Sequence, residues 1–115
     1  MSADCLFCKI AAGDIPSTVV YETDQLLAIR DINPQAPTHV VLFPRAHYPD
    51  AATLADADPG LAGAVLAAAG EVARSEGVAE SGYRLVFNTG ADGGQTVFHV
   101  HCHLLGGRQA TWPPG

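Results

Sequence analysis

The feature that most constrains the fold of this chain is a run of three histidines at strict two-residue spacing. His99, His101 and His103 alternate with apolar residues at positions 100, 102 and 104. Alternation with a period of two is typical of a β-strand, whose successive side chains point to opposite faces. The spacing therefore predicts a strand over 98–105, with the imidazoles on one face about 6.6 Å apart and an apolar face against a core.

Three uses of such an imidazole row remain open on spacing alone. The row could be a polar, solvent-facing edge strand, or a metal site, because imidazole is a common metal ligand. It could also catalyse a reaction at phosphorus, since a neutral imidazole is a nucleophile and a protonated one donates to phosphate oxygens or to a leaving group. Cys102 points to the opposite face and is expected to be a small buried apolar residue, not a nucleophile.

At this point the sequence resembles the histidine triad (HIT) family. His99–Leu105 fits the family pattern of His-x-His-x-His followed by two apolar residues. Three further stretches resemble its Hint branch, nucleotide-binding proteins that hydrolyse nucleoside phosphoramidates. They are Asp31–His39, Asn88 to Gly94-Gln95-Thr96, and the tail Gly106–Gly115. The match runs from about Cys5 to the last residue.

The expected elements indicate an α+β fold in a single domain spanning residues 1–115. The pattern predicts a short helical turn at 5–12, strands at 19–22, 26–31, 39–43, 83–88 and 98–105, and one long helix from Asp58-Pro59 to Gly77. This order predicts a five-stranded, mainly antiparallel sheet covered by the long helix. The resemblance implies a HIT-like sheet that dimerises into a ten-stranded one, with the tail 110–115 directed toward the partner subunit. A disordered terminus is the alternative for the tail.

Charge and hydropathy narrow the functional classes. The net charge of −6 argues against broad binding to nucleic acid, which requires a basic surface, but it is compatible with a mononucleotide in a local pocket. No apolar run approaches the roughly 20 residues that span a bilayer, so we expect no membrane association. The acidic start Met1–Asp4 is not followed by a long apolar stretch, so we expect no signal peptide and a cytoplasmic protein.

The resemblance implies a role for each histidine of the site. His101 would be the nucleophile that carries the nucleotidyl group, and His103 would donate to phosphate oxygens or to the departing amine. His99 and His39 would orient this pair, although His39 begins an apolar strand and could instead be a core histidine. Because one His101 nitrogen attacks, the other must carry the proton, and we expect it to donate to a backbone carbonyl.

A glycine-rich turn at 90–96 leads directly into the triad. Glycines allow backbone N–H groups to approach an anion, so the turn is a candidate phosphate cradle, although many such turns are only hairpins. The resemblance implies that Asp31 accepts from the ribose hydroxyls and that Ile32 lines the base pocket. It also implies nucleotide contacts from Asn88, Gly94, Gln95, Thr96, His101 and His103.

The two cysteines of the Cys5-x-x-Cys8 pair indicate either a redox pair or half of a zinc site. No thioredoxin-like βαβ pattern surrounds them, so a metal is favoured. With His47 and His99 they would form a closed tetrahedral structural zinc site, at positions that some zinc-bearing triad relatives also use. The alternative is two buried thiols without a metal.

The resemblance, together with these observations, implies a purine nucleoside 5′-phosphoramidate hydrolase that acts through a covalent nucleotidyl-histidine. Its partners would be a purine nucleoside monophosphate or phosphoramidate and a second copy of the chain. The alternatives are a dinucleoside polyphosphate hydrolase and a nucleotide-binding regulatory module. A transferase branch has glutamine at the third triad position, so His103 argues against it. A metal oxygenase site is disfavoured because no carboxylate lies at a suitable spacing.

Overall fold

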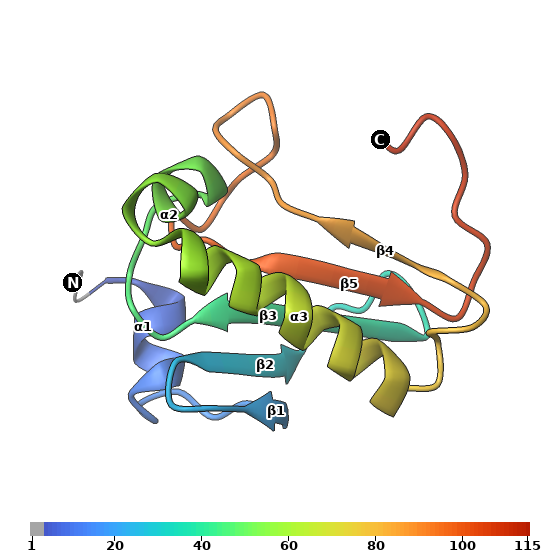
Figure 1. Ribbon diagram of the computed structural model, residues 1–115, viewed down its shortest axis with the longest axis horizontal. Helices are drawn as coiled ribbons and strands as arrows, with labels where there is room; N and C mark the ends of the chain where they lie inside the picture. The colour runs from blue at the N-terminus through green and yellow to red at the C-terminus, as the bar shows by residue number, and fades with distance from the viewer. Residues whose placement is uncertain (1–3) are drawn as a thin grey trace.

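The computed structural model describes residues 4–115, so Met1 to Ala3, on which the signal-peptide expectation partly rests, lie outside the described residues. The elements are α1 (Leu6–Ala11), β1 (Val19–Glu22), β2 (Leu26–Arg30), β3 (Thr38–Pro44), α2 (Ala51–Ala57), α3 (Pro59–Ser75), β4 (Tyr83–Val86) and β5 (Cys102–Gly106). Figure 1 shows α3 lying across one face of the sheet. Between residues 4 and 115, no helix has the length and apolar character needed to cross a membrane.

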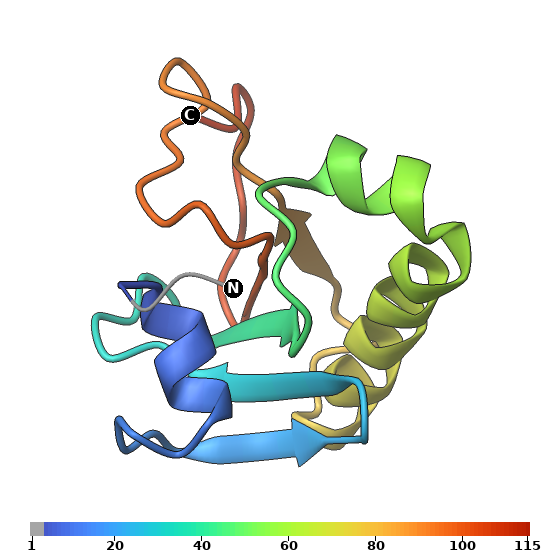
Figure 2. The same cartoon turned by 90° about the vertical axis from the view of Figure 1, so that its left-hand side faces the viewer.

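The five strands form one sheet in the order β1-β2-β3-β5-β4, and every neighbouring pair is antiparallel. The central strand β3 is buried along its whole length, because helices cover the sheet on both sides. Figure 2 shows α1 on one face and α3 on the other. The predicted α+β class and five-stranded antiparallel sheet are therefore confirmed.

Helix α3 begins where the sequence predicts. The side chain of Asp58 accepts a hydrogen bond from the backbone N–H of Leu61 at 3.0 Å, and Pro59 occupies the first turn, where its missing N–H removes no bond. The helix ends before Gly77, whose φ of +76° suits a residue without a side chain. The residues predicted to share its apolar face are buried: Leu61, Val65, Ala68 and Val72.

The expected short N-terminal helix and long helix are present as α1 and α3, but the expected helix count was wrong, because a further short helix, α2, precedes α3. Asp50 caps α2 by accepting from the backbone N–H of Thr53 at 2.8 Å. Leu54 is its only buried residue. A seven-residue helix with a single buried side chain has no apolar repeat at helical spacing, so the pattern of the sequence does not reveal it.

The sheet separates two apolar clusters. Val40 and Leu42 of β3 face α3, whereas Val41 and Phe43 face α1. The α1-side cluster contains Cys5, Phe7, Cys8, Leu27, Ile29, Val41 and Phe43. His103 of β5 pairs in register with Val41, so the catalytic candidates lie on the α1 side.

The triad strand is shorter than predicted. β5 begins at Cys102, so only His103 of the three triad histidines lies within a strand. The backbone N–H of Val100 donates to the carbonyl of Tyr48 at 2.7 Å, in the loop after β3 and outside the sheet. The β3 ladder ends at the pair Leu42–Cys102. His99 is fully buried, whereas His101 and His103 are partly exposed.

Candidate functional site

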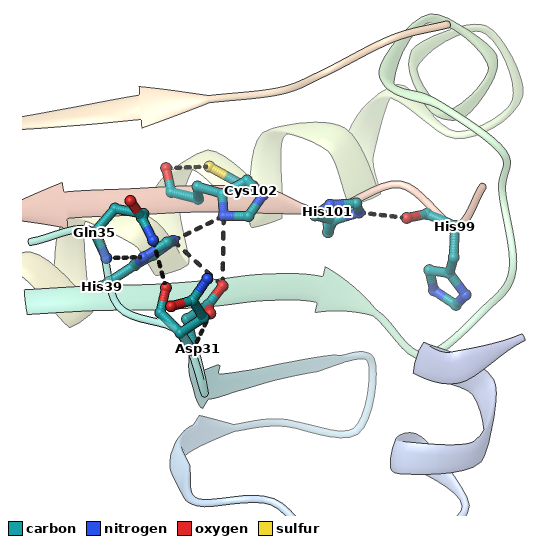
Figure 3. Close-up of polar contacts among 8 residues, drawn as sticks. Asp31, Gln35, His39, His99, His101 and Cys102 are labelled. Carbon is teal, nitrogen blue, oxygen red and sulfur yellow. Dashed lines mark hydrogen bonds and ion pairs between the residues drawn. The ribbon is translucent and has the colours of Figure 1, made fainter. Parts of the chain in front are cut away.

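His101 lies immediately before β5, with its Nδ1 atom 2.7 Å from the carbonyl oxygen of His99 (Figure 3). A carbonyl can only accept, so Nδ1 carries the proton and donates it, and Nε2 keeps a lone pair. Burial lowers the pKa of His101, against the opposing effects of this hydrogen bond and of the Asp31 charge. The ring is therefore neutral near pH 7 and presents an unprotonated Nε2, the form that attacks phosphorus.

The orientation of His103 follows from its neighbours. Nδ1 of the buried His39 lies 3.0 Å from the backbone nitrogen of Gln35, and its Nε2 lies 2.9 Å from Nδ1 of His103. The Gln35 N–H can only donate, so His39 Nδ1 accepts and His39 Nε2 carries the proton. His39 then donates to His103 Nδ1, which leaves an N–H on Nε2 of a neutral His103. That N–H can donate to a phosphate oxygen.

Asp31 supplies the negative charge next to this histidine pair, as Figure 3 shows. One carboxylate oxygen accepts from the backbone N–H of Asn33 at 2.8 Å, and the other lies 3.4 Å from His39 Nε2. Burial lowers the pKa of His39, and it lowers the pKa of His103 to about 4, aided by the neighbouring imidazoles and opposed by Asp31. Both rings are thus neutral near pH 7.

Asp31, His39 and His103 bring three possible metal-ligand atoms within 4.8 Å of one another. The sequence did not predict this carboxylate beside two imidazoles, because Asp31 follows β2 whereas His103 lies in β5. However, His39 Nε2 carries a proton while its Nδ1 accepts from Gln35, so it has no lone pair to give a metal. The group is a hydrogen-bonded chain in this arrangement.

An apolar groove of about 320 Å³ runs beside Asp31, between α1 and β2. Its lining includes Leu6, Phe7, Ile10, Ile29, Ile32 and Val41. Ile32 was expected in a base pocket and lies at this groove with its side chain fully exposed. A groove of this size with one carboxylate at its rim fits a planar base with an attached sugar.

The glycine-rich turn is held in shape by the side chain of Gln95. This buried amide accepts from the Gly90 N–H at 2.9 Å and donates to the carbonyls of Pro49 at 2.7 Å and Val97 at 3.2 Å. Gly94 has a φ of +80°, which favours glycine. Gln95 therefore supports the turn, while Asn88 is partly exposed and Gly94 and Thr96 are exposed.

The four predicted metal ligands converge at the N-terminal end of α1. The Sγ atom of Cys5 lies 3.3 Å from His99 Nδ1, and Sγ of Cys8 lies 3.5 Å from the same nitrogen and 3.4 Å from His47 Nδ1. Sulfur and nitrogen ligands of one tetrahedral zinc ion are about 3.6 Å apart, given the usual bond lengths. The ligand atoms of all four residues lie within 4.8 Å of one another, so the set fits zinc.

The orientation of His99 also suits a metal ligand. Its Nε2 lies 2.7 Å from the carbonyl oxygen of Pro44, so Nε2 carries the proton and Nδ1 presents a lone pair to the thiols. Burial lowers the pKa of His99, which favours this neutral ring. The ring points away from His103, and His99 reaches the catalytic pair through its backbone carbonyl.

Three residues that contact the site were missed by the sequence analysis. Phe7 packs against the His101 ring, with ring centroids 4.8 Å apart. Gln35 sets the tautomer of His39, and Arg108 donates through Nε to the Gln35 carbonyl at 2.9 Å. Gln35 and Arg108 fall inside the stretches that carry the family resemblance, and Phe7 lies between the two cysteines. None belongs to a residue type that indicates catalysis by itself.

The C-terminal tail leaves the sheet after β5 (Figure 1). Arg84 of β4 donates to the carbonyl of Thr111 at 2.8 Å, and Trp112 is 84% exposed. An indole with this exposure has no covering surface within the described part of the chain. Arg84 therefore holds the tail near residue 111, and residues 111–115 are exposed.

Comparison with known proteins agrees with this geometry. The model of the HIT domain matches residues 12–110, and the chain belongs to the HIT domain family. A crystal structure of a HIT family hydrolase from Legionella pneumophila Philadelphia 1 superimposes with a TM-score of 0.94 at 54% identity. The match covers 97% of this chain and all of the other.

Two curated relatives carry names that bear on the site. The "14 kDa zinc-binding protein" of Zea mays is 52% identical over 96% of this chain and 87% of its own length. The "purine nucleoside phosphoramidase" of Escherichia coli strain K12 is 44% identical over 94% of this chain and 91% of its own length.

Proposed function

We propose that this protein hydrolyses purine nucleoside 5′-phosphoramidates through a covalent nucleotidyl-His101 intermediate. The observation that carries the proposal is that two adjacent imidazole rings, His101 and His103, carry their protons on different ring nitrogens. His101 presents an unprotonated Nε2, anchored by the His99 carbonyl, while His103 presents an N–H on its own Nε2. The name of the E. coli relative supports the substrate class.

The chemistry follows from these two rings. His101 Nε2 forms a bond to phosphorus as the P–N bond breaks, and the departing nitrogen needs a proton to leave as an amine. A bound phosphoramidate anion favours the protonated form of His103, in which His39 Nε2 would donate to Asp31 instead of to His103, and this form supplies the proton. Water then attacks phosphorus and returns a proton to His103, and His101 leaves with its lone pair. The products are the nucleoside monophosphate and the amine.

Recognition of the nucleotide is assigned to the groove beside α1. The purine would pack against the apolar lining. The Asp31 carboxylate accepts one hydrogen bond from the Asn33 N–H, and its remaining lone pairs would accept hydrogen bonds from the ribose hydroxyls. Apolar packing discriminates weakly between adenine and guanine, so we expect both purines to be accepted.

The experiment that tests the reaction is mass spectrometry of enzyme quenched during turnover of adenosine 5′-phosphoramidate. We expect a nucleotidyl adduct on His101, and loss of both adduct and turnover in His101→Ala. Near-normal turnover of His101→Ala would exclude the covalent mechanism. A matched variant, Cys102→Ala, changes the next residue on the opposite face and should retain the adduct. Burial raises the pKa of the Cys102 thiol to about 12, so it is not expected to take part in the chemistry.

A parallel substrate panel separates the alternative functions. It contains adenosine 5′-phosphoramidate, a diadenosine polyphosphate and a nucleotide sugar. Preferential cleavage of the diadenosine compound would assign a dinucleoside polyphosphate hydrolase. Tight binding of AMP without turnover of any compound would assign a nucleotide-binding regulatory module.

We also propose that Cys5, Cys8, His47 and His99 bind a structural zinc ion. Two thiolates and two imidazoles fill a tetrahedral shell, so the ion would crosslink α1 to the loop after β3 and would leave no position for substrate. The name of the maize relative supports the metal. Metal analysis of protein purified without chelator should find about one zinc per chain, lost in Cys5→Ser but retained in Cys102→Ala. Fully active protein without zinc would exclude the site.

A further inference from the structure

Helix α1 joins three parts of the site that lie far apart in the sequence. Its Phe7 ring is 4.6 Å from the ring of Phe43 and 4.8 Å from that of His101, measured between centroids. Leu6 and Ile10 of the same helix line the apolar groove. Cys8 belongs to the metal-ligand cluster, and Cys5 immediately precedes the helix. One short helix therefore contacts the nucleophile, the groove and the cluster.

A helix of six residues needs outside support. Isolated helices shorter than about 12 residues are marginal in water, because nucleation costs more than a few hydrogen bonds return. Two contacts support α1 near the site, the stacking of Phe7 on Phe43 and the convergence of Cys5 and Cys8 on His99, and Arg45 also donates to the Ala11 carbonyl at 3.5 Å. The second support depends on the state of the cluster.

We propose that Phe7 is a positioning residue for His101, and that the Cys/His cluster holds Phe7 in place by fastening α1 to His99. The role assigned to His101 rests on the proposed hydrolase function, and the fastening of α1 by the cluster rests on the proposed zinc site. Two routes join the cluster to the nucleophile. His101 donates a hydrogen bond from Nδ1 to the carbonyl oxygen of His99, and Phe7 packs against the ring of His101.

The contact constrains the rotation of the nucleophile. The His101 ring is held at one edge by the His99 carbonyl and on another side by the Phe7 ring. If Phe7 moves away, the imidazole gains room to turn, and the hydrogen bond that fixes its tautomer weakens. A misplaced nucleophile loses rate even when the substrate still binds, because attack requires an aligned lone pair.

The first test replaces Phe7 with leucine, which keeps an apolar lining for the groove but removes the aromatic ring. We expect adduct formation on His101 to slow on the order of tenfold, with a smaller change in AMP affinity. The ¹⁵N signals of the His101 ring should shift toward a mixture of tautomers. Phe87→Leu is the matched control, because Phe87 packs in the α3-side cluster, and it should leave both measurements unchanged.

The second test addresses the cluster in the full-length protein. Zinc is removed with a chelator, and hydrogen exchange is followed at the amides of Lys9 and Ala12, which donate to the carbonyls of Cys5 and Cys8. We expect both amides to lose protection and the His101 ring signals to shift as in Phe7→Leu. Added zinc should reverse both changes in the wild type but not in Cys8→Ser.

The outcomes distinguish this proposal from the proposed function. The ring signals and amide exchange are measured without substrate, so they decide the mechanical link even if no phosphoramidate is cleaved. Unchanged His101 signals in Phe7→Leu, or α1 amides that remain protected without metal, would overturn the proposal. A slowed adduct with unchanged ring signals would also overturn it, because Phe7 would then act on the substrate alone.

Discussion

At the scale of single residues, the proposed mechanism depends on a division of roles between two neighbouring imidazoles, His101 and His103. Sequence spacing placed His101 and His103 together, but the direction of each proton depends on partners from elsewhere. The His99 carbonyl fixes one ring, and the chain from Gln35 through His39 fixes the other. Contacts of this kind arise from tertiary packing, so a strand pattern could not predict which nitrogen attacks and which donates.

The lowered pKa of His103 predicts a pH dependence of stability. Burial moves this pKa from 6.5 to about 4. Below pH 6.5 the unfolded chain binds a proton that the folded protein does not bind until about pH 4, so the free energy of unfolding falls as pH falls through this window. With its side chain 21% exposed, His103 should account for about 1–2 kcal/mol of lost stability at pH 5.

The measurement is urea unfolding of the wild type and of His103→Gln at pH 7.5 and pH 5.0, with excess zinc throughout. Other titrating groups contribute to both proteins, so the difference between them isolates His103. We expect the variant to lose less stability on acidification. An equal loss in both proteins would contradict the assignment of a neutral, buried His103.

Gln95 has a structural role that its position in the glycine-rich turn does not reveal. Its amide makes three hydrogen bonds to backbone groups, and Gln95→Met would leave those groups without partners. We expect a loss of about 2–3 kcal/mol in the free energy of unfolding, because unsatisfied buried polar groups are costly. Denaturant unfolding checks this, with Gln109→Met as the control: this exposed amide donates only to Ala110 and should lose under about 0.5 kcal/mol. Equal losses would contradict the proposed role.

At the scale of the elements, local signals succeeded where they were strong and periodic. The Asp58-Pro59 start of α3 and the strand β3 could both be predicted, because a capping residue followed by proline and a continuous apolar run are visible in the local sequence. The start of β5 could not, since it depends on a bond between Val100 and Tyr48, 52 positions apart in the numbering. The convergence of Asp31 with His103 was likewise set by the pairing of β2, β3 and β5.

The loop between β2 and β3 links the C-terminal segment to the histidines. Arg108 donates to the carbonyl of Gln35, whose own N–H donates to His39. Gly107 approaches Pro37 so closely that an added Cβ would lie 2.9 Å from the proline Cβ. The segment after β5 therefore holds the loop between β2 and β3 in place, and the Gln35 N–H of that loop sets the tautomer of His39.

We predict that Arg108→Met lowers kcat several-fold, because a looser Gln35 orients His39 and His103 less well; misplaced catalytic groups commonly cost about tenfold or more. Arg108→Lys should not restore the rate, since the ammonium group cannot reproduce the Nε contact. Arg84→Met is the control, because it releases the tail at Thr111 without touching the loop. Steady-state kinetics with adenosine 5′-phosphoramidate decides between them, and equal effects of Arg84→Met and Arg108→Met would assign Arg108 to the tail instead.

At the scale of the whole molecule, the family and the five-stranded sheet could be predicted from the motifs, whereas the assembly remains a proposal. Each outer strand, β1 and β4, has one neighbour in the described sheet. A second copy could continue the sheet at such an edge and form the expected ten-stranded homodimer. The exposed Trp112 of the tail is the feature most readily explained by a partner surface.

We predict that the tail selects the leaving group across the dimer. Removing Thr111–Gly115 should change the relative kcat/KM values of phosphoramidates with small and bulky amines on the order of tenfold, as expected when an apolar contact to a substituent is lost. AMP affinity should change less, because no residue of the tail lines the groove beside α1. Removing Gly115 alone is the control. Sedimentation of both proteins tests the same proposal independently, since a monomeric wild type has no partner site for the tail to reach. Parallel changes for all amines, or a monomer at assay concentrations, would exclude this role for the tail.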